Sequence, residues 1–184
     1  YKQYCRKGSR SYCPKKLSGV LQTPDLQFGF KPQHSTTQCT FILQEVVDYY
    51  TNRDSPVFVT LLDATRAFDR VHYVKLFRLM LKRGMCPSLI KLIISMYICQ
   101  SLVVRWANVL SCPFSCSNGI KQGGVLSPVL FCVYIEELIS RLRALNIGCF
   151  VGHKFAGVMT YADDVTSMAP THAATMKMLE VCRD

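Results

Sequence analysis

The chain has 184 residues, of which 49% are hydrophobic and 18% charged, and its formal net charge is +10, from 22 Lys and Arg against 12 Asp and Glu. This composition excludes a disordered protein, and the length suits one domain with a real core or part of a larger one. The positive charge suggests a polyanionic partner, with nucleic acid ahead of an anionic membrane.

Residues 1–24 show no sustained periodicity and predict a basic, irregular N-terminal arm. Basic residues outnumber acids by seven to one in the first 34 positions, which fits either a solvated arm or a specific contact with nucleic acid. A Gly/Pro loop at 28–34 follows. Ser35 or Thr36 can then cap a helix that runs to about Asn52.

A short run rich in β-branched and aromatic residues, 57–63, predicts a central strand that is buried on both faces and carries Asp63 at its tip. The apolar spacing then becomes helical over 69–83, with Asp69 as the expected cap and Gly84 as the stop. Pro87 is expected at the first position of another helix.

The second half of the chain begins with two predicted strands, at 102–106 and 113–117, and a flexible bend at 119–124. Residues 127–146 predict a long amphipathic helix with one apolar stripe, and residues 157–168 predict a β-hairpin. Thr171 can cap a final helix. This order predicts an α+β domain with a largely antiparallel sheet packed on helices.

Ten cysteines at irregular spacings, without a CxxC pair, predict reduced and mostly buried thiols. No apolar run is long enough to span a membrane, because charged residues interrupt each candidate. We therefore expect no membrane partner and an intracellular location, in the nucleus or the cytoplasm. The sequence contains no P-loop, GxGxxG or HExxH motif, so several common enzyme classes are unsupported.

The predicted hairpin contains two adjacent carboxylates, Asp163 and Asp164, between β-prone runs. Asp is common in turns, so these residues can simply form the turn. They can also bind a divalent cation, since Mg²⁺ prefers carboxylate oxygens and leaves room for substrate phosphates. Asp63 could supply a third carboxylate if its strand neighbours the hairpin, although a polar residue at a strand end is also ordinary. Three such carboxylates could serve two-metal phosphoryl transfer.

Two further features fit a nucleotide site. Phe68 could place a ring beside a bound sugar, or it could be an ordinary core aromatic. Gln122 and Gly123 could bring an amide and bare backbone close to a ligand, or they could form a plain flexible loop.

Four blocks of residues resemble the reverse transcriptases, and most closely those of non-LTR (LINE-type) retrotransposons. Their order and rough spacing match over residues 27 to 183, and YADD is the most specific of them. The blocks are Phe28–Pro32 (FGFKP), Leu61–Arg70 (LLDATRAFDR), Gly119–Pro128 (GIKQGGVLSP) and Tyr161–Asp164 (YADD).

The resemblance implies a partial reverse transcriptase domain at 25–184, with the fingers and palm of a right-hand polymerase and an end before the thumb. It implies an RNA-directed DNA polymerase that uses two Mg²⁺ ions, or Mn²⁺ as a substitute, to extend a DNA primer with dNTPs on an RNA or DNA template. Protein partners are not implied.

The resemblance also implies roles for individual residues. Asp63 and Asp163 would be the principal metal ligands, with Asp164 as the third member of the triad. Phe68 would exclude a ribose 2′-hydroxyl. The remaining implied contacts are those of Gln122 and Gly123 with the incoming nucleotide and template, of Tyr161 with the primer end, and of Lys31, at a position that is usually Arg, with primer or template.

Two other readings remain open. A retroelement-derived module could bind nucleic acid through its positive charge without polymerising. A related right-hand polymerase, such as telomerase or a group II intron protein, would share the three carboxylates.

Overall fold

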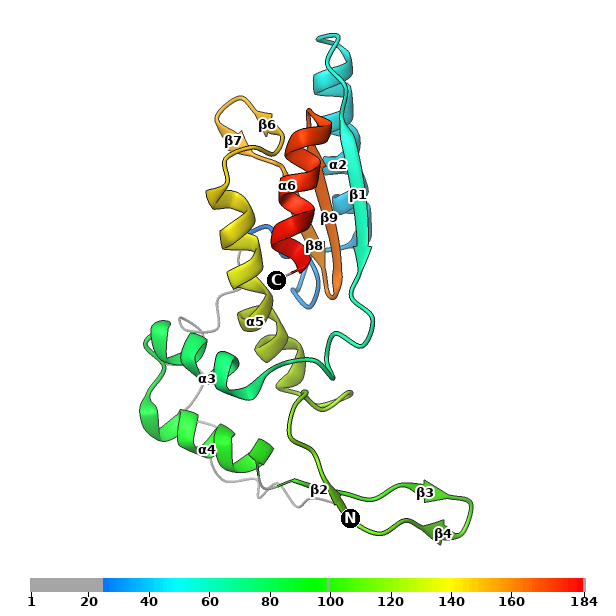
Figure 1. Cartoon of the computed structure of the whole chain (residues 1–184), viewed down its shortest axis with the longest axis vertical. Helices are drawn as coiled ribbons and strands as arrows, with labels where there is room; N and C mark the ends of the chain where they lie inside the picture. Colours follow the sequence, from blue (N-terminus) through cyan, green and yellow to red (C-terminus); the bar gives the residue numbers. More distant parts are fainter. Residues whose placement is uncertain (1–24, 99, 184) are drawn as a thin grey trace. The chain divides into compact units, whose positions relative to one another are not determined.

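The structure, a computed structural model, describes residues 25–98 and 100–183. The predicted arm at 1–24 lies outside the described residues. The chain divides into two compact units (Figure 1). Of the described residues, unit 1 comprises 73–98 and 100–117, and unit 2 comprises 25–72 and 118–183.

Unit 2 is built on a three-stranded antiparallel sheet in the order β1-β9-β8. The strands are β1 (Phe58–Asp63), β8 (Val158–Tyr161) and β9 (Asp164–Ala169). A short segment lies along β8, where Gln27 forms a parallel bridge with Thr160. The segment is held there by hydrogen bonds from Phe28 N to Thr160 O and from Thr160 N to Leu26 O, both 2.8 Å.

Three helices cover this sheet: α2 (Thr36–Thr51), α5 (Ser127–Ala144) and α6 (His172–Arg183). Helix α6 packs on β1 and β9, and α5 packs on β8 and α6. In Figure 1, α5 and α6 lie on the viewer's side of the sheet and α2 lies behind it. Val46 of α2 is buried in a cluster with Cys149, Met159 and Met168. The result is a layered α+β core.

The helix starts follow the predicted capping residues. Ser35 is the N-cap of α2, and its backbone N–H is accepted by the Gln38 side chain at 3.3 Å. The Thr171 hydroxyl accepts the Ala174 N–H at 3.2 Å at the start of α6. Both predicted caps are therefore confirmed.

A small hairpin of β6 (Phe150–Val151) and β7 (Lys154–Phe155) follows α5.

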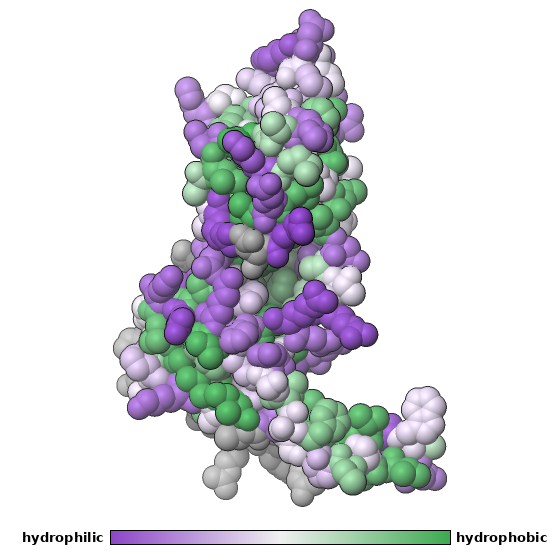
Figure 2. Space-filling model, viewed as in Figure 1, coloured by the Kyte–Doolittle hydropathy of each residue, from purple (hydrophilic) through white to green (hydrophobic). Residues whose placement is uncertain are grey.

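Unit 1 pairs α3 (Tyr73–Lys82) with α4 (Pro87–Ile98). It also contains β2 (Ser101–Leu102) paired with β5 (Phe114–Ser115), and β3 (Arg105–Trp106) paired with β4 (Val109–Leu110). Apolar side chains of the β3–β4 hairpin, Trp106, Val109 and Leu110, are exposed, and Figure 2 shows green atoms gathered in this part of the chain. The strand predicted at 102–106 is thus two short strands, β2 and β3, and the strand predicted at 113–117 is shortened to β5. Strand β4 was not predicted.

Two predictions about the first half of the chain are wrong. Strand β1 is not central and buried, because it lies at one edge of the sheet and Leu61 is 74% exposed. Helix α3 begins at Tyr73 rather than 69, because Arg66 adopts a positive φ of 58° and residues 65–70 form turns. Asp69 donates its N–H to Arg66 O within those turns, so it is not the helix cap.

Two further predictions need correction. The buried residues of helix α5 are not confined to one stripe, because the consecutive residues Phe131, Cys132 and Val133 are all buried. The seven cysteines among the described residues form no disulfide, as predicted, but Cys132 and Cys149 alone among these seven are buried. Among the described residues, no helix combines the length and hydropathy that a membrane span requires.

Candidate active site

The β8–β9 hairpin closes through a two-residue turn, Ala162-Asp163, after the last cross-strand pair of Tyr161 with Asp164. Two-residue hairpin turns favour positive φ, because this geometry matches the twist of the strands. Ala162 adopts a φ of 57°. For a residue with a Cβ atom this left-handed conformation costs roughly 1–2 kcal/mol. The turn that presents Asp163 is therefore strained.

Asp63 lies directly opposite Asp164 in the β1–β9 register. Directly opposed residues of an antiparallel pair project from the same face, with Cβ atoms about 4.5–5.5 Å apart. Asp163 occupies the adjacent turn position. The sheet thus brings all three predicted carboxylates to one end, although 100 residues separate Asp63 from Asp163 in the sequence.

The carboxylates also affect one another electrostatically. The pKa of Asp164 is raised, first by partial burial and then by the negative charges of Asp163 and Asp63. Like charges close together disfavour ionisation, and a bound cation would relieve this. This end of the sheet is therefore a site of concentrated negative charge in a strongly basic chain.

The donor set fits a hard divalent cation, because carboxylate oxygens are the ligands that Mg²⁺ prefers. However, within residues 25–98 and 100–183, no three His, Cys, Asp or Glu side chains are gathered in the geometry of a metal site. The backbone register brings the donors to one place, and side-chain rotation would have to complete a coordination shell.

Gln27 contacts the same turn and was not predicted from the sequence. Its side chain is fully buried and makes hydrogen bonds with both the N–H and the C=O of Ala162, at 3.2 and 3.1 Å. These contacts join residues 135 positions apart, so no local pattern reveals them. One available signal was Gly29, since glycine often marks a close approach of two backbones.

Phe68 is half-buried and stacks on Phe131 of α5, with ring centroids 4.9 Å apart and planes 13° apart. Phe68 also contacts Phe30 in a T-shaped arrangement, with ring centroids 6.0 Å apart. These are the contacts of a packed aromatic side chain. They fix the ring in place and so fit both the core role and the sugar-contacting role.

The bend before α5 is anchored at its start. Gly119 N donates to Val71 O and Ile120 N donates to Phe68 O, both at 2.9 Å. The bend therefore lies beside Phe68. Gln122 and Gly123 follow in an exposed turn, with Gly123 at a positive φ of 75°.

The two remaining predicted residues lie in different settings. Tyr161 is half-buried and is paired with Asp164. Lys31 is half-buried in the segment after Phe30, and burial lowers its pKa while the charge of Asp25 opposes that shift. Tyr161 is thus adjacent to the triad, and Lys31 belongs to the segment that follows the Gln27 contacts.

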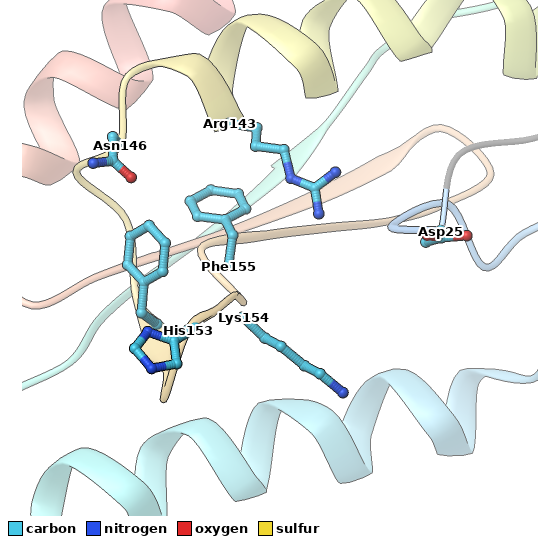
Figure 3. Close-up of a pocket in the computed structure, with 7 residues that line it drawn as sticks. Asp25, Arg143, Asn146, His153, Lys154 and Phe155 are labelled. Carbon is cyan, nitrogen blue, oxygen red and sulfur yellow. The ribbon is translucent and has the colours of Figure 1, made fainter.

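Unit 2 also contains an open cavity of about 600 Å³. Arg143 of α5, His153 and Lys154 of the β6–β7 hairpin, and Phe155 line it (Figure 3). Asp25, Asn146 and Phe150 complete the lining. The lining includes none of the three carboxylates, and its charge is mainly positive.

Residues 7–184 match the family model described as "Reverse transcriptase (RNA-dependent DNA polymerase)". The chain is 30% identical over 146 residues to a probable RNA-directed DNA polymerase from transposon BS of Drosophila melanogaster. The aligned region covers 77% of this chain and 15% of that protein. It is 22% identical over 169 residues to the Pol polyprotein of the retrotransposable element R2DM from the same organism, with coverage of 92% and 16%. The chain thus spans less than a fifth of the length of these relatives.

Solved structures show the same fold at low sequence identity. A telomerase from Candida albicans, in complex with a fragment of telomeric RNA, matches with a TM-score of 0.63 at 12% identity, over 92% of this chain and 31% of that one. A telomerase from Candida tropicalis matches with a TM-score of 0.60 at 12% identity, over 86% and 32%.

The family match covers nearly the whole chain and includes both strands and the turn that carry the carboxylates. The chain therefore belongs to the reverse transcriptase family and is related to the reverse transcriptases of non-LTR retrotransposons.

Proposed function

We propose that this chain carries the nucleotidyl-transfer site of an RNA-directed DNA polymerase, which extends a primer 3′-hydroxyl with dNTPs on an RNA or DNA template. The observation that carries the proposal is the pairing of Asp63 with Asp164 next to the turn at Asp163. Within this proposal, residues 25–184 form the fingers and palm of the polymerase.

Asp63 and Asp163 are the principal ligands of two Mg²⁺ ions in this proposal, and Asp164 is the third carboxylate. Mn²⁺ is a possible substitute because it accepts the same oxygen ligands. When bound, such a pair of ions activates the attacking hydroxyl and stabilises both oxygens of an in-line displacement. The raised pKa of Asp164 supports the assignment, because the charges of Asp163 and Asp63 add to the larger effect of burial and a bound cation would relieve their repulsion.

The other predicted residues would position the substrates. Phe68, held by Phe131, would place a rigid ring against the sugar and exclude a 2′-hydroxyl. Gln122 and Gly123 would contact the incoming nucleotide and template from the exposed turn. Tyr161 would lie at the primer end, and Lys31 would contact primer or template.

A primer-extension assay with an RNA template, dNTPs and Mg²⁺ tests the proposal. Asp163→Asn removes a charge at the turn without changing side-chain size, and we expect the extension rate to fall by about 10²-fold or more, the scale of losing one preorganised electrostatic group. Asp69→Asn is the matched control, because Asp69 is exposed in the turns before α3 and should leave the rate unchanged.

The second candidate function is nucleic-acid binding without polymerisation. The basic cavity around Arg143, His153 and Lys154 favours it, because those side chains can bind phosphates away from the carboxylates. Salt-dependent binding that Asp63→Asn leaves unchanged, together with a wild-type chain that shows no Mg²⁺-dependent extension, would establish this function and contradict the polymerase proposal.

A further inference from the structure

A short segment passes directly beneath the Ala162-Asp163 turn. Gly29 lies so close to it that a Cβ atom at this position would stand 2.1 Å from Ala162 N and 2.7 Å from Ala162 Cα. No side chain fits in such a gap, so only glycine permits this approach. The segment and the turn are therefore packed backbone to backbone.

Both the oxygen and the nitrogen of the Gln27 side-chain amide form hydrogen bonds at this contact. Its Oε1 accepts the N–H groups of Gly29 at 2.8 Å and of Ala162 at 3.2 Å, and its Nε2 donates to Ala162 O at 3.1 Å. The two converging N–H donors fix which end of the amide is oxygen, because a flipped amide would oppose donor to donor. One buried side chain thus pairs with both backbone polar groups of Ala162.

These hydrogen bonds act on the residue that needs support. Ala162 is held in the left-handed region at φ 57°, where a residue with a Cβ is disfavoured. Strained backbone persists only where surrounding contacts determine it. Asp163 follows Ala162 directly. The orientation of the Ala162 peptide therefore determines the direction in which the Asp163 side chain leaves the backbone.

We propose that Gln27 is a positioning residue, which fixes the strained Ala162 peptide and thereby aims Asp163 at the metal ions. The inference rests on the proposed function for its catalytic consequence. The geometric part, that Gln27 determines the conformation of the turn, does not depend on polymerase activity. Two experiments separate these parts.

The first experiment measures the Mg²⁺ dependence of primer extension for Gln27→Leu. Leu fills a similar volume and removes all three hydrogen bonds, so the half-saturating Mg²⁺ concentration should rise about 10- to 100-fold, as is typical when a group that orients metal ligands is lost. Thr160→Val is the matched control. It removes a partly buried hydrogen bond to Leu26 O of the same segment without touching the turn.

The control separates positioning from stability. Both variants should lower the melting temperature, but Thr160→Val should keep the wild-type Mg²⁺ dependence. An equal shift in both variants, or a wild-type Mg²⁺ dependence for Gln27→Leu, would overturn the inference.

The second experiment reads the turn itself by NMR of the metal-free chain. The Ala162 amide should exchange faster with solvent in Gln27→Leu, and its methyl shift should move away from the left-handed value, while both remain unchanged in Thr160→Val. Unchanged Ala162 signals in Gln27→Leu would contradict the inference even if wild-type extension fails. If wild type extends no primer but the Ala162 signals change, the proposed function is wrong and the geometric inference stands.

Gly29→Ala provides a further variant if Gln27→Leu does not fold. It keeps the Gln27 amide but pushes against the Ala162 backbone. The Mg²⁺ dependence should shift in the same direction as for Gln27→Leu. Wild-type Mg²⁺ dependence in a folded Gly29→Ala chain would count against positioning by this segment.

Discussion

Ala162 combines an unfavourable backbone conformation with a place next to the candidate metal ligands. Its φ of 57° lies in the region that glycine adopts freely. Strained residues of this kind concentrate at functional sites, where the surrounding contacts hold them. The Gln27 hydrogen bonds and the close approach of Gly29 are such contacts. Strain and support therefore occur together at a single residue.

Replacing Ala162 with Gly should relieve this strain. We expect Ala162→Gly to change the free energy of unfolding by between zero and about +1 kcal/mol, because the relieved conformational cost is partly offset by the greater freedom of glycine in the unfolded chain. Ala173→Gly, on the exposed surface of α6, should instead destabilise by up to about 1 kcal/mol. Urea unfolding of both variants measures the difference. Equal losses would show that Ala162 is not strained.

At the scale of elements, local patterns predicted where helices α2 and α6 begin but did not predict the position of a strand within the sheet. Helices α2 and α6 begin after the predicted caps, because a cap acts on the residues next to it. Strand β1 has the continuous apolar run of a central strand yet lies at the sheet edge. An apolar run reports what can be buried, and the position in the sheet depends on partners more than 100 residues away.

The candidate site divides in the same way. Asp63, Asp163 and Asp164 could be named from the sequence because carboxylates at strand ends and turns have a recognisable chemistry. Their pairing required the register of β1 with β9. Gln27 could not be named, because Gly29 indicates only that some backbone approaches closely, and the role of a nearby amide depends on which backbone that is. Helix α3 was predicted too early for a related reason, since the positive φ of Arg66 is not visible in the apolar spacing.

A hydrogen bond links helix α2 to the β6–β7 hairpin, in which Phe150 N donates to the Tyr50 hydroxyl at 2.8 Å. Tyr50→Phe leaves this partly buried N–H without that acceptor and should cost about 1–3 kcal/mol of stability. Tyr49→Phe is the matched control on the same helix, because the Tyr49 ring keeps its contact with Arg53 and the change should cost less than about 0.5 kcal/mol. Chemical denaturation tests both variants, and equal losses would contradict the role of this hydrogen bond.

Over the whole molecule, the net charge of +10 contrasts with the acidic end of the sheet. A basic surface attracts a nucleic-acid backbone, whereas three carboxylates repel it unless cations intervene. Binding and catalysis should therefore respond differently to ions. Added monovalent salt should weaken binding, and divalent cations should be needed for the chemistry.

Salt dependence tests this separation. If the chain contacts six to ten phosphates, its affinity for a primer–template duplex should fall about 10³- to 10⁵-fold between 50 and 200 mM salt.

Lys154→Ala, in the basic cavity, should weaken binding and reduce the slope of log K against log salt by about one. Lys177→Ala, on the exposed surface of α6, is the matched control for loss of one charge. Fluorescence anisotropy at several salt concentrations measures the slopes, and equal slopes for the two variants would show that the cavity does not contact phosphate. Asp163→Asn should leave the slope unchanged while it lowers the extension rate, because the carboxylates act on the metal ions and the basic side chains act on the nucleic-acid backbone.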